Sequence, residues 1–148
     1  LQLIKELALY EREPDIVEAT EPMLEAGIFG ADAVASVELA EHDGPDGPEV
    51  AGMAFWYRTF STWTGRPGIY LEDLVVRERY RKHGYGKSLL RRLAKIAVER
   101  GYGRFEWSVL DWNTPSIDFY DAMGAAPTGG WIRYRLEGAG LRRLSERA

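Results

Sequence analysis

Apolar positions follow helical spacing at the start of the chain. One helical face collects four of them, namely Leu3, Ile4, Leu7 and Tyr10. We therefore expect a helix that is already under way at residue 1, with no capping residue before it. A short second helix is expected over Ile16–Ala26, and Gly27 would end it.

Runs of β-branched and aromatic residues then predict strands. The expected strands are Val34–Ala40, Val50–Phe60, Ile69–Val76, Phe105–Leu110 and Trp131–Leu136. The stretch His42–Pro48 is rich in Gly and Pro, so we expect a turn there, with His42 exposed to solvent. A loop is expected over Ser61–Pro67.

The clearest helix pattern covers Gly86–Arg100, where apolar residues repeat every three to four positions and basic residues lie between them. Asn113 is suited to cap a further helix that runs to about Met123, with Pro115 tolerated in its first turn. A short tail helix is expected over Gly140–Arg147.

The order of these elements is two helices, three strands, then helix, strand, helix and strand. It predicts an α/β fold of the layered α+β kind with a mixed sheet. The chain has 148 residues and shows no linker, repeat or low-complexity segment, which favours one domain over residues 1–148. Hydrophobic residues make up 45% of it, enough for a packed core and against disorder.

Charge and residue types narrow the function classes. The formal net charge of −4 disfavours nucleic-acid binding, which usually needs a basic surplus. No apolar run reaches the roughly 18 residues of a membrane span, and no signal peptide is visible at the start, so we expect a cytoplasmic protein. The chain has no cysteine, which rules out disulfides and a cysteine nucleophile. We expect no metal site, because neither His42 nor His83 has suitable neighbours.

The spacing Arg81-x-x-Gly84-x-Gly86 lies between a predicted strand and a predicted helix. A helix N-terminus has about four unpaired N–H groups and a partial positive charge, and glycines let the backbone close on an anion. Arg81 and Lys87 add full positive charge. The spacing alone fits either a phosphate site or an ordinary strand–helix turn. It is neither a Walker loop nor a dinucleotide fingerprint.

The residues around this spacing resemble the GNAT acetyltransferase superfamily. The resemblance is carried by Tyr70–Val76, Tyr80–Gly86 and Leu110–Tyr120. It extends from Ile4 to Trp131, and its closest match is the diamine and thialysine N-acetyltransferase branch, which includes spermidine/spermine acetyltransferase. It implies a mixed, mostly antiparallel central sheet flanked by helices. The strand and loop that family members carry before the first helix are missing here, so we expect a truncated N-terminus.

The resemblance implies acetyl-CoA as co-substrate and assigns residues that would hold it. Those residues are Leu74, Val75, Val76, Arg81, Lys82, His83, Gly84, Tyr85, Gly86, Lys87, Asn113, Pro115, Ser116 and Tyr120. Tyr120 matches the general acid that protonates the leaving thiolate, although by chemistry alone it reads as a helix tyrosine packed on a sheet. Asn113 is also explained fully by its capping role.

A second implied set surrounds the amine. It comprises Tyr10, Glu11, Trp63, Glu72, Asp73, Glu106, Trp107, Ser108 and Trp131. Glu72 would accept the ammonium proton, and strand alternation would send the side chains of Glu72 and Asp73 to opposite faces. An acid among aromatic rings suits a cation, while each aromatic taken singly also fits a core or a dimer interface. In the loop before Trp63, polyamine enzymes often carry an extra acid, whereas Ser61 is closer to what thialysine acetyltransferases carry there.

The sequence therefore predicts an acetyl-CoA-dependent N-acetyltransferase acting on a primary amine of a small cationic molecule, either a diamine, a polyamine, thialysine or a lysine-like compound. Direct attack on the thioester is implied. The alternatives are a protein or peptide N-acetyltransferase and a non-catalytic acetyl-CoA-binding module. By resemblance we also expect a homodimer, with the C-terminal strand region near the partner, and no binding to nucleic acid or membranes.

Overall fold

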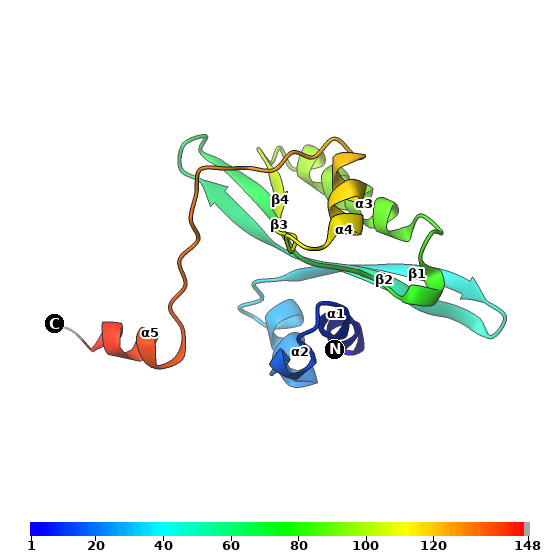
Figure 1. Cartoon of the computed structure of the whole chain (residues 1–148), viewed down its shortest axis with the longest axis horizontal. Helices are drawn as coiled ribbons and strands as arrows, with labels where there is room; N and C mark the ends of the chain where they lie inside the picture. Colours follow the sequence, from blue (N-terminus) through cyan, green and yellow to red (C-terminus); the bar gives the residue numbers. More distant parts are fainter. Residues whose placement is uncertain (147–148) are drawn as a thin grey trace. The chain divides into compact units, whose positions relative to one another are not determined.

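The computed structural model describes residues 1–146 as two compact units, Leu1–Ser108 and a C-terminal unit that begins at Val109. In these residues one sheet has the strand order β1-β2-β3-β4 (Figure 1). Its strands are β1 Ser36–Gly44, β2 Gly47–Ser61, β3 Arg66–Val76 and β4 Phe105–Trp107. Neighbours among β1 to β3 run antiparallel, and β4 runs parallel to β3. The predicted mixed, mostly antiparallel sheet is confirmed.

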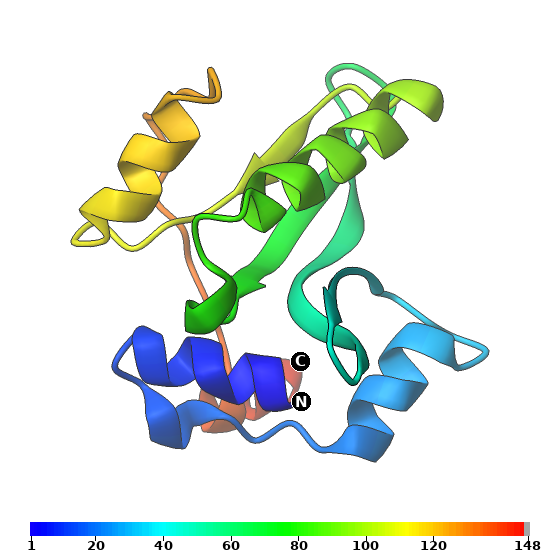
Figure 2. The same cartoon turned by 90° about the vertical axis from the view of Figure 1, so that its right-hand side faces the viewer.

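Helices cover both faces of this sheet (Figures 1 and 2). On one side lie α1, Gln2–Tyr10, and α2, Glu21–Phe29, and on the other lies α3, Tyr85–Glu99. Beneath α1 the core contains Leu3, Met53 and Val75. The apolar stripe predicted for α3 is buried at Leu89, Leu90, Leu93, Ile96 and Ala97, whereas Ala94, predicted to belong to it, is exposed.

The second helix starts and ends later than predicted. It begins after Thr20, whose hydroxyl accepts a hydrogen bond from the Met23 N–H at 3.4 Å, and Pro22 occupies its first turn. Pro is tolerated there because the first N–H groups of a helix have no intrahelical acceptor. The helix continues through Gly27, and Pro14–Ile16 forms a separate 3₁₀ turn.

The turn expected over His42–Pro48 is much shorter than predicted. The reversal takes place between the paired Gly44 and Gly47, and Gly47 has the positive φ of 113° that glycine tolerates. His42 therefore lies in strand β1 opposite Glu49, where it is half-buried. The prediction that it is a solvated turn residue is wrong.

The C-terminal unit contains α4, Thr114–Asp121, and α5, Gly138–Ser145. The predicted cap is confirmed, since the Asn113 side chain accepts a hydrogen bond from the Ser116 N–H at 3.4 Å. The tail helix was predicted to end at Arg147, which lies outside the described residues.

Two strand predictions at the C-terminal end are wrong. Strand β4 stops at Trp107, three residues before the predicted end. Residues 131–136 are irregular and exposed, and no strand pairs with them among residues 1–146. Alternating apolar residues indicate only which side chains could share a face, whereas a strand also needs a neighbouring backbone to accept its hydrogen bonds.

Candidate functional site

The predicted phosphate site, residues 81–87, lies in the loop between β3 and α3 and at the start of α3, and is named the cradle. After β3 the chain makes a 3₁₀ turn, Glu78–Tyr80, and α3 then begins at Tyr85 with Gly84 as its N-cap. The Ser88 N–H donates to the Gly84 carbonyl at 2.9 Å. The N–H groups of Tyr85, Gly86 and Lys87 thus precede the first intrahelical bond and point out of the helix start. This end of α3 carries the positive end of the helix dipole.

Backbone conformation leaves the cradle open to a ligand. Gly84 has a φ of +85°, and a Cβ there would meet no atom of the described residues within 4 Å. Lys82 has a φ of +67°, a left-handed conformation that costs a non-glycine residue of order 1 kcal/mol or more. Strain of this kind persists where the surrounding structure holds it. Lys82 and Lys87 are exposed, so a diphosphate would fit the open, cationic helix start.

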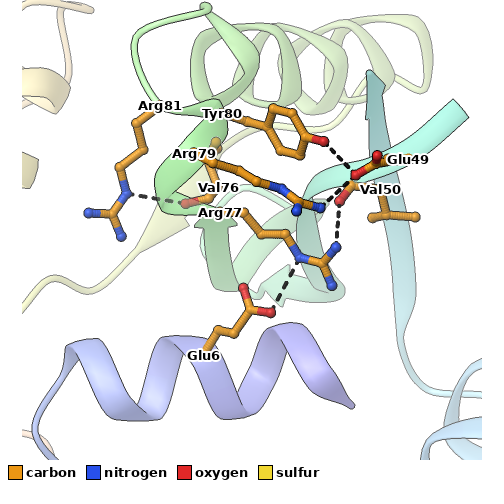
Figure 3. A network of polar contacts seen from close by, with 8 residues as sticks. All are labelled: Glu6, Glu49, Val50, Val76, Arg77, Arg79, Tyr80 and Arg81. Atoms are coloured by element: carbon orange, nitrogen blue, oxygen red, sulfur yellow. Dashed lines mark hydrogen bonds and ion pairs between the residues drawn. The ribbon is translucent and has the colours of Figure 1, made fainter. Parts of the chain in front are cut away.

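Arg81 joins the cradle to the end of α1. Its Nε donates a hydrogen bond to the Val76 carbonyl at 3.2 Å (Figure 3). Its guanidinium lies over the Tyr10 ring, 5.0 Å from the centroid, within the range of a cation–π contact. The structure therefore brings a predicted cofactor residue against a predicted amine-site residue.

A β-bulge interrupts β3 beside the cradle. Asp73 pairs with Phe55, but the next pair joins Leu71 to Trp56, so Glu72 has no Cα partner on β2 in the described structure. Asp73 consequently shares a face with Val75, which packs under α1, while Leu71 lies on the opposite face. The bulge therefore interrupts the simple alternation along β3, because Leu71 and Asp73, two positions apart, lie on opposite faces.

Part of the β3 edge next to the bulge is left without a strand partner. The pairing with β4 covers Ile69 to Leu71 and ends there, because β4 stops at Trp107. Within Leu1–Ser108, the edge from Glu72 to Val76 therefore has no partner strand on that side. Backbone groups of Leu74 to Val76, which the sequence assigned to the thioester, lie on this segment.

Carboxylates gather between the bulge and the end of α1. Burial, followed by the charges of Glu72 and Glu11, raises the pKa of Asp73 to about 6. Burial also raises the pKa of Glu11 above its usual range. A cation bound here would relieve the repulsion and favour the ionised forms. The structure thus brings together four predicted amine-site residues, namely Tyr10, Glu11, Glu72 and Asp73.

The other predicted amine-site residues of this unit lie on β4 and on the β2–β3 turn. Glu106 is engaged by Arg104, with Oε2 and Nε 2.7 Å apart. The Ser108 and Tyr70 hydroxyls are 2.7 Å apart. The Trp107 ring packs against Phe105 at 4.9 Å between centroids. Trp63 is exposed in the turn between β2 and β3.

The remaining predicted residues belong to the C-terminal unit. Asn113 is buried at the start of α4, and Pro115 and Ser116 form the first turn of that helix. Tyr120 lies in its last turn and is half-buried, with its ring 5.4 Å from that of Phe119. Trp131 is exposed in the irregular segment. The role of Tyr120 as general acid stays a prediction.

Sequence reasoning missed a polar network that braces the cradle from β2 (Figure 3). The Tyr80 hydroxyl and the Arg79 guanidinium both donate to Glu49 Oε2 at 2.6 Å. These two contacts lower the pKa of Glu49, and the hydrogen bond to Glu49 raises the pKa of Tyr80. Glu49 is thirty or more residues from its partners, and no local pattern indicates that it meets them.

Arg77 extends this network to α1. Its Nη1 donates to the Val50 carbonyl at 3.1 Å, and its Nε lies 3.3 Å from Glu6 Oε1 (Figure 3). The second contact is an ion pair without the alignment of a hydrogen bond, since the buried Nε has no hydrogen-bond partner. The network therefore ties β2, the cradle and α1 together.

Among residues 1–146, no three His, Cys, Asp or Glu side chains gather in a way that could hold a metal ion. The described helices include none with the length and apolar character to span a bilayer.

The chain thus combines a mixed sheet, a bulge in its third strand and a helix that begins at a left-handed glycine after that strand. The chain belongs to the acetyltransferase (GNAT) family, whose family model matches residues 4–125. It is therefore a GNAT-type acyltransferase.

Individual proteins agree with this family. The chain is 39% identical to a thialysine N-ε-acetyltransferase from Bos taurus over 153 residues, which covers 98% of this chain and 89% of the relative. It is 35% identical to a human spermidine/spermine N(1)-acetyltransferase-like protein over 92% of this chain and 20% of that protein. An integron cassette protein from V. cholerae superimposes with a TM-score of 0.79 at 27% identity, covering 99% of this chain and 89% of that one. The predicted family and branch are confirmed.

Proposed function

We propose that this protein transfers an acetyl group from acetyl-CoA to a primary amine of a small cationic substrate, either a diamine, a polyamine, thialysine or a lysine-like compound. The observation that carries the proposal is the position of the acids. The charges of Glu72 and Glu11 both act on Asp73, which shares a face of β3 with Val75 beneath α1, and Arg81 connects Tyr10, at the end of α1, to the cradle.

Acetyl-CoA would bind with its diphosphate at the start of α3. The N–H groups of Tyr85, Gly86 and Lys87 would donate to the phosphate oxygens, and Lys82 and Lys87 would add charge. The thioester would extend along the edge of β3 from Glu72 to Val76, where backbone N–H groups could stabilise the developing oxyanion. Asn113, Pro115 and Ser116 would contact the pantetheine arm.

The amine arrives as an ammonium, because an alkyl amine has a pKa near about 10.4. The carboxylates attract it, and Glu72 accepts its proton directly or through water. The neutral nitrogen then attacks the thioester carbonyl carbon. A C–N bond forms and the C–S bond breaks; of the two protons still on nitrogen, one passes to water and the other stays on the amide product. Tyr120 protonates the leaving thiolate.

The relatives support a small amine as acceptor. One is named a thialysine acetyltransferase and another a spermidine/spermine acetyltransferase-like protein, and thialysine, spermidine and spermine all carry primary amines on flexible chains. The mildly acidic chain, with a net charge of −4, also suits a cationic substrate. We further propose that residues 1–148 act as one acetyltransferase domain, because the family match crosses from the first compact unit into the second and ends at residue 125.

A substrate panel tests this proposal. Purified protein would be mixed with acetyl-CoA and, separately, with diamines, spermidine, thialysine, lysine, ornithine and a lysine-containing peptide array, and products would be identified by mass spectrometry. We expect CoA release with at least one small amine. Turnover with peptides alone would contradict the proposed small amine substrate and indicate a peptide N-acetyltransferase. Tight acetyl-CoA binding without any product would indicate a non-catalytic module.

We also propose that a second copy of the chain covers the irregular segment. Ile132 and Tyr134 are 81% and 90% exposed, and alternating apolar residues of this kind are suited to add a strand to a neighbouring sheet. Light scattering at micromolar concentration should show a dimer for the wild type and a weakened one for Ile132→Asp. Val98→Asp changes a residue of similar exposure on α3 and should leave the dimer intact. A wild-type monomer would refute this assembly.

A further inference from the structure

The two variable positions around Gly84 in the cradle motif are occupied by rings that meet a strand far away in the sequence. His83 and Tyr85 lie near His42 of β1, forty residues earlier. His42 Nδ1 is 2.8 Å from the Tyr85 hydroxyl, and its ring is 4.8 Å from that of Tyr80. The glycine spacing that binds an anion does not require any of these side chains.

Tyr85 is the first residue of α3, and its ring and its backbone N–H belong to the same residue. A contact that fixes the ring therefore also restrains the direction of the N–H. The turn before it contains two left-handed residues, Lys82 and Gly84, and most of its length is exposed. Such a segment has several accessible conformations unless side chains restrain it. The bond from His42 supplies a restraint from the sheet at the point where the helix begins.

We propose that His42 is a positioning residue for the diphosphate of acetyl-CoA. By holding the Tyr85 hydroxyl, it keeps the first turn of α3 aimed at the anion before the anion arrives, and so lowers the entropic cost of binding. The inference rests on the proposed function, because the anion in question is the co-substrate. His42 touches neither reacting atom, so it should affect affinity more than the chemical step.

The structure offers a matched control for this contact. Glu38 also lies on β1, four residues before His42, and pairs with Arg92 of α3 with Nε and Oε2 3.0 Å apart. Arg92 is seven residues beyond Tyr85 on the same helix. Both pairs join β1 to α3, but only the His42 pair reaches the helix start. A loss that came from general β1–α3 packing would appear in both.

The experiment measures CoA binding by calorimetry in the wild type, His42→Leu, His42→Gln and Glu38→Gln. We expect His42→Leu to raise the Kd for CoA about tenfold, the scale of one lost hydrogen bond. His42→Gln retains a side chain able to hold the hydroxyl and should stay within about threefold of the wild type, and so should Glu38→Gln. In the Tyr85→Phe background, His42→Leu should have little further effect, because both changes remove the same contact.

Steady-state kinetics and amide exchange complete the test. His42→Leu should raise the KM for acetyl-CoA with kcat within about twofold of the wild type. Without any ligand, it should also accelerate amide exchange in residues 82–87, whereas Glu38→Gln should not. Equal CoA affinity in wild type and His42→Leu would overturn the inference, as would equal losses in His42→Leu and Glu38→Gln. If the wild type itself does not bind CoA, the proposed function fails together with this inference.

Discussion

The Arg81 guanidinium lies over the Tyr10 ring, 5.0 Å from its centroid, and this contact links the cofactor cradle to the last turn of α1. The two residues are 71 positions apart, and the sequence assigned them to different ligands. Because of this contact, we expect a substitution at Arg81 to affect binding of the amine directly, in addition to its effect on acetyl-CoA binding.

Arg81→Ala should therefore weaken acetyl-CoA binding and also raise the KM for the amine. The cation–π contact and the bond to the Val76 carbonyl are each worth about 1 kcal/mol, so a five- to tenfold change in the amine KM is expected. Arg79→Ala is the control, because the Arg79 guanidinium lies over a different ring, 4.8 Å from the centroid of Tyr80, and donates to Glu49. An unchanged amine KM in Arg81→Ala would show that the contact with Tyr10 has no role in the amine site.

The raised pKa of Asp73 predicts how stability depends on pH. A carboxyl whose pKa is higher in the folded chain binds its proton more tightly there, so the free energy of unfolding falls as pH rises from about 4 to above 6. The shift corresponds to a loss on the order of 3 kcal/mol. Asp73→Asn should remove it and be more stable than the wild type at pH 8, but not below pH 4.

Urea unfolding between pH 4 and pH 8 measures this difference. Asp118→Asn, which changes an exposed aspartate on α4, should follow the wild type throughout. Parallel curves for the wild type and Asp73→Asn would mean that Asp73 is not held in an unfavourable charged state. A saturating cationic amine should shrink the difference, because it stabilises the ionised carboxylate.

Tyr120→Phe tests the proposed general acid. Removing a proton donor to the leaving thiolate should lower kcat about 100-fold and leave the Kd for acetyl-CoA within about twofold. The ring packing against Phe119 would be retained. Phe119→Leu, which alters that packing and keeps the hydroxyl, should reduce kcat far less. Loss of affinity with normal turnover in Tyr120→Phe would show that Tyr120 only binds the cofactor.

Gly84→Ala should separate backbone strain from ligand contact. Gly84 and Gly124 have nearly the same φ, +85° and +84°, and a Cβ at either would meet no atom of the described residues within 4 Å. Each alanine should therefore cost about 1 kcal/mol of stability, measured by urea unfolding. Only Gly84→Ala should also weaken CoA binding, by at least tenfold in calorimetry. Equal CoA affinity in both variants would place the diphosphate elsewhere.

Local patterns in the sequence were enough to predict most of the fold. Helical periodicity predicted α1 and α3, and Asn113 was identified as a cap, because these features depend on residues within a few positions of one another. The cradle was predicted for the same reason, since its glycines, its cationic residues and the helix start are adjacent in the chain.

The arrangement of the acids was decided by tertiary structure. The bulge at Glu72 comes from the register between β2 and β3, and it turns Asp73 toward α1 and away from the face of Leu71. The pKa of Asp73 depends on burial, on the adjacent Glu72 and on Glu11, which is 62 residues away. Neither the register between β2 and β3 nor the interaction between Glu11 and Asp73 can be predicted from the periodicity of the sequence, because both join residues far apart in the chain.

The cradle was predicted from residues adjacent in the chain, but the side chains that contact it come from distant segments and were not predicted. His42 was predicted to be in a solvated turn, yet it lies in β1 and contacts Tyr85. Strand Trp131–Leu136 was predicted from its β-branched and aromatic residues, yet it has no partner strand within residues 1–146. Both outcomes depend on which backbone lies alongside, and that is decided only when distant segments pack together. The sequence by itself determined most of the elements and the glycine-containing start of α3, and the packing determined which residues face one another there.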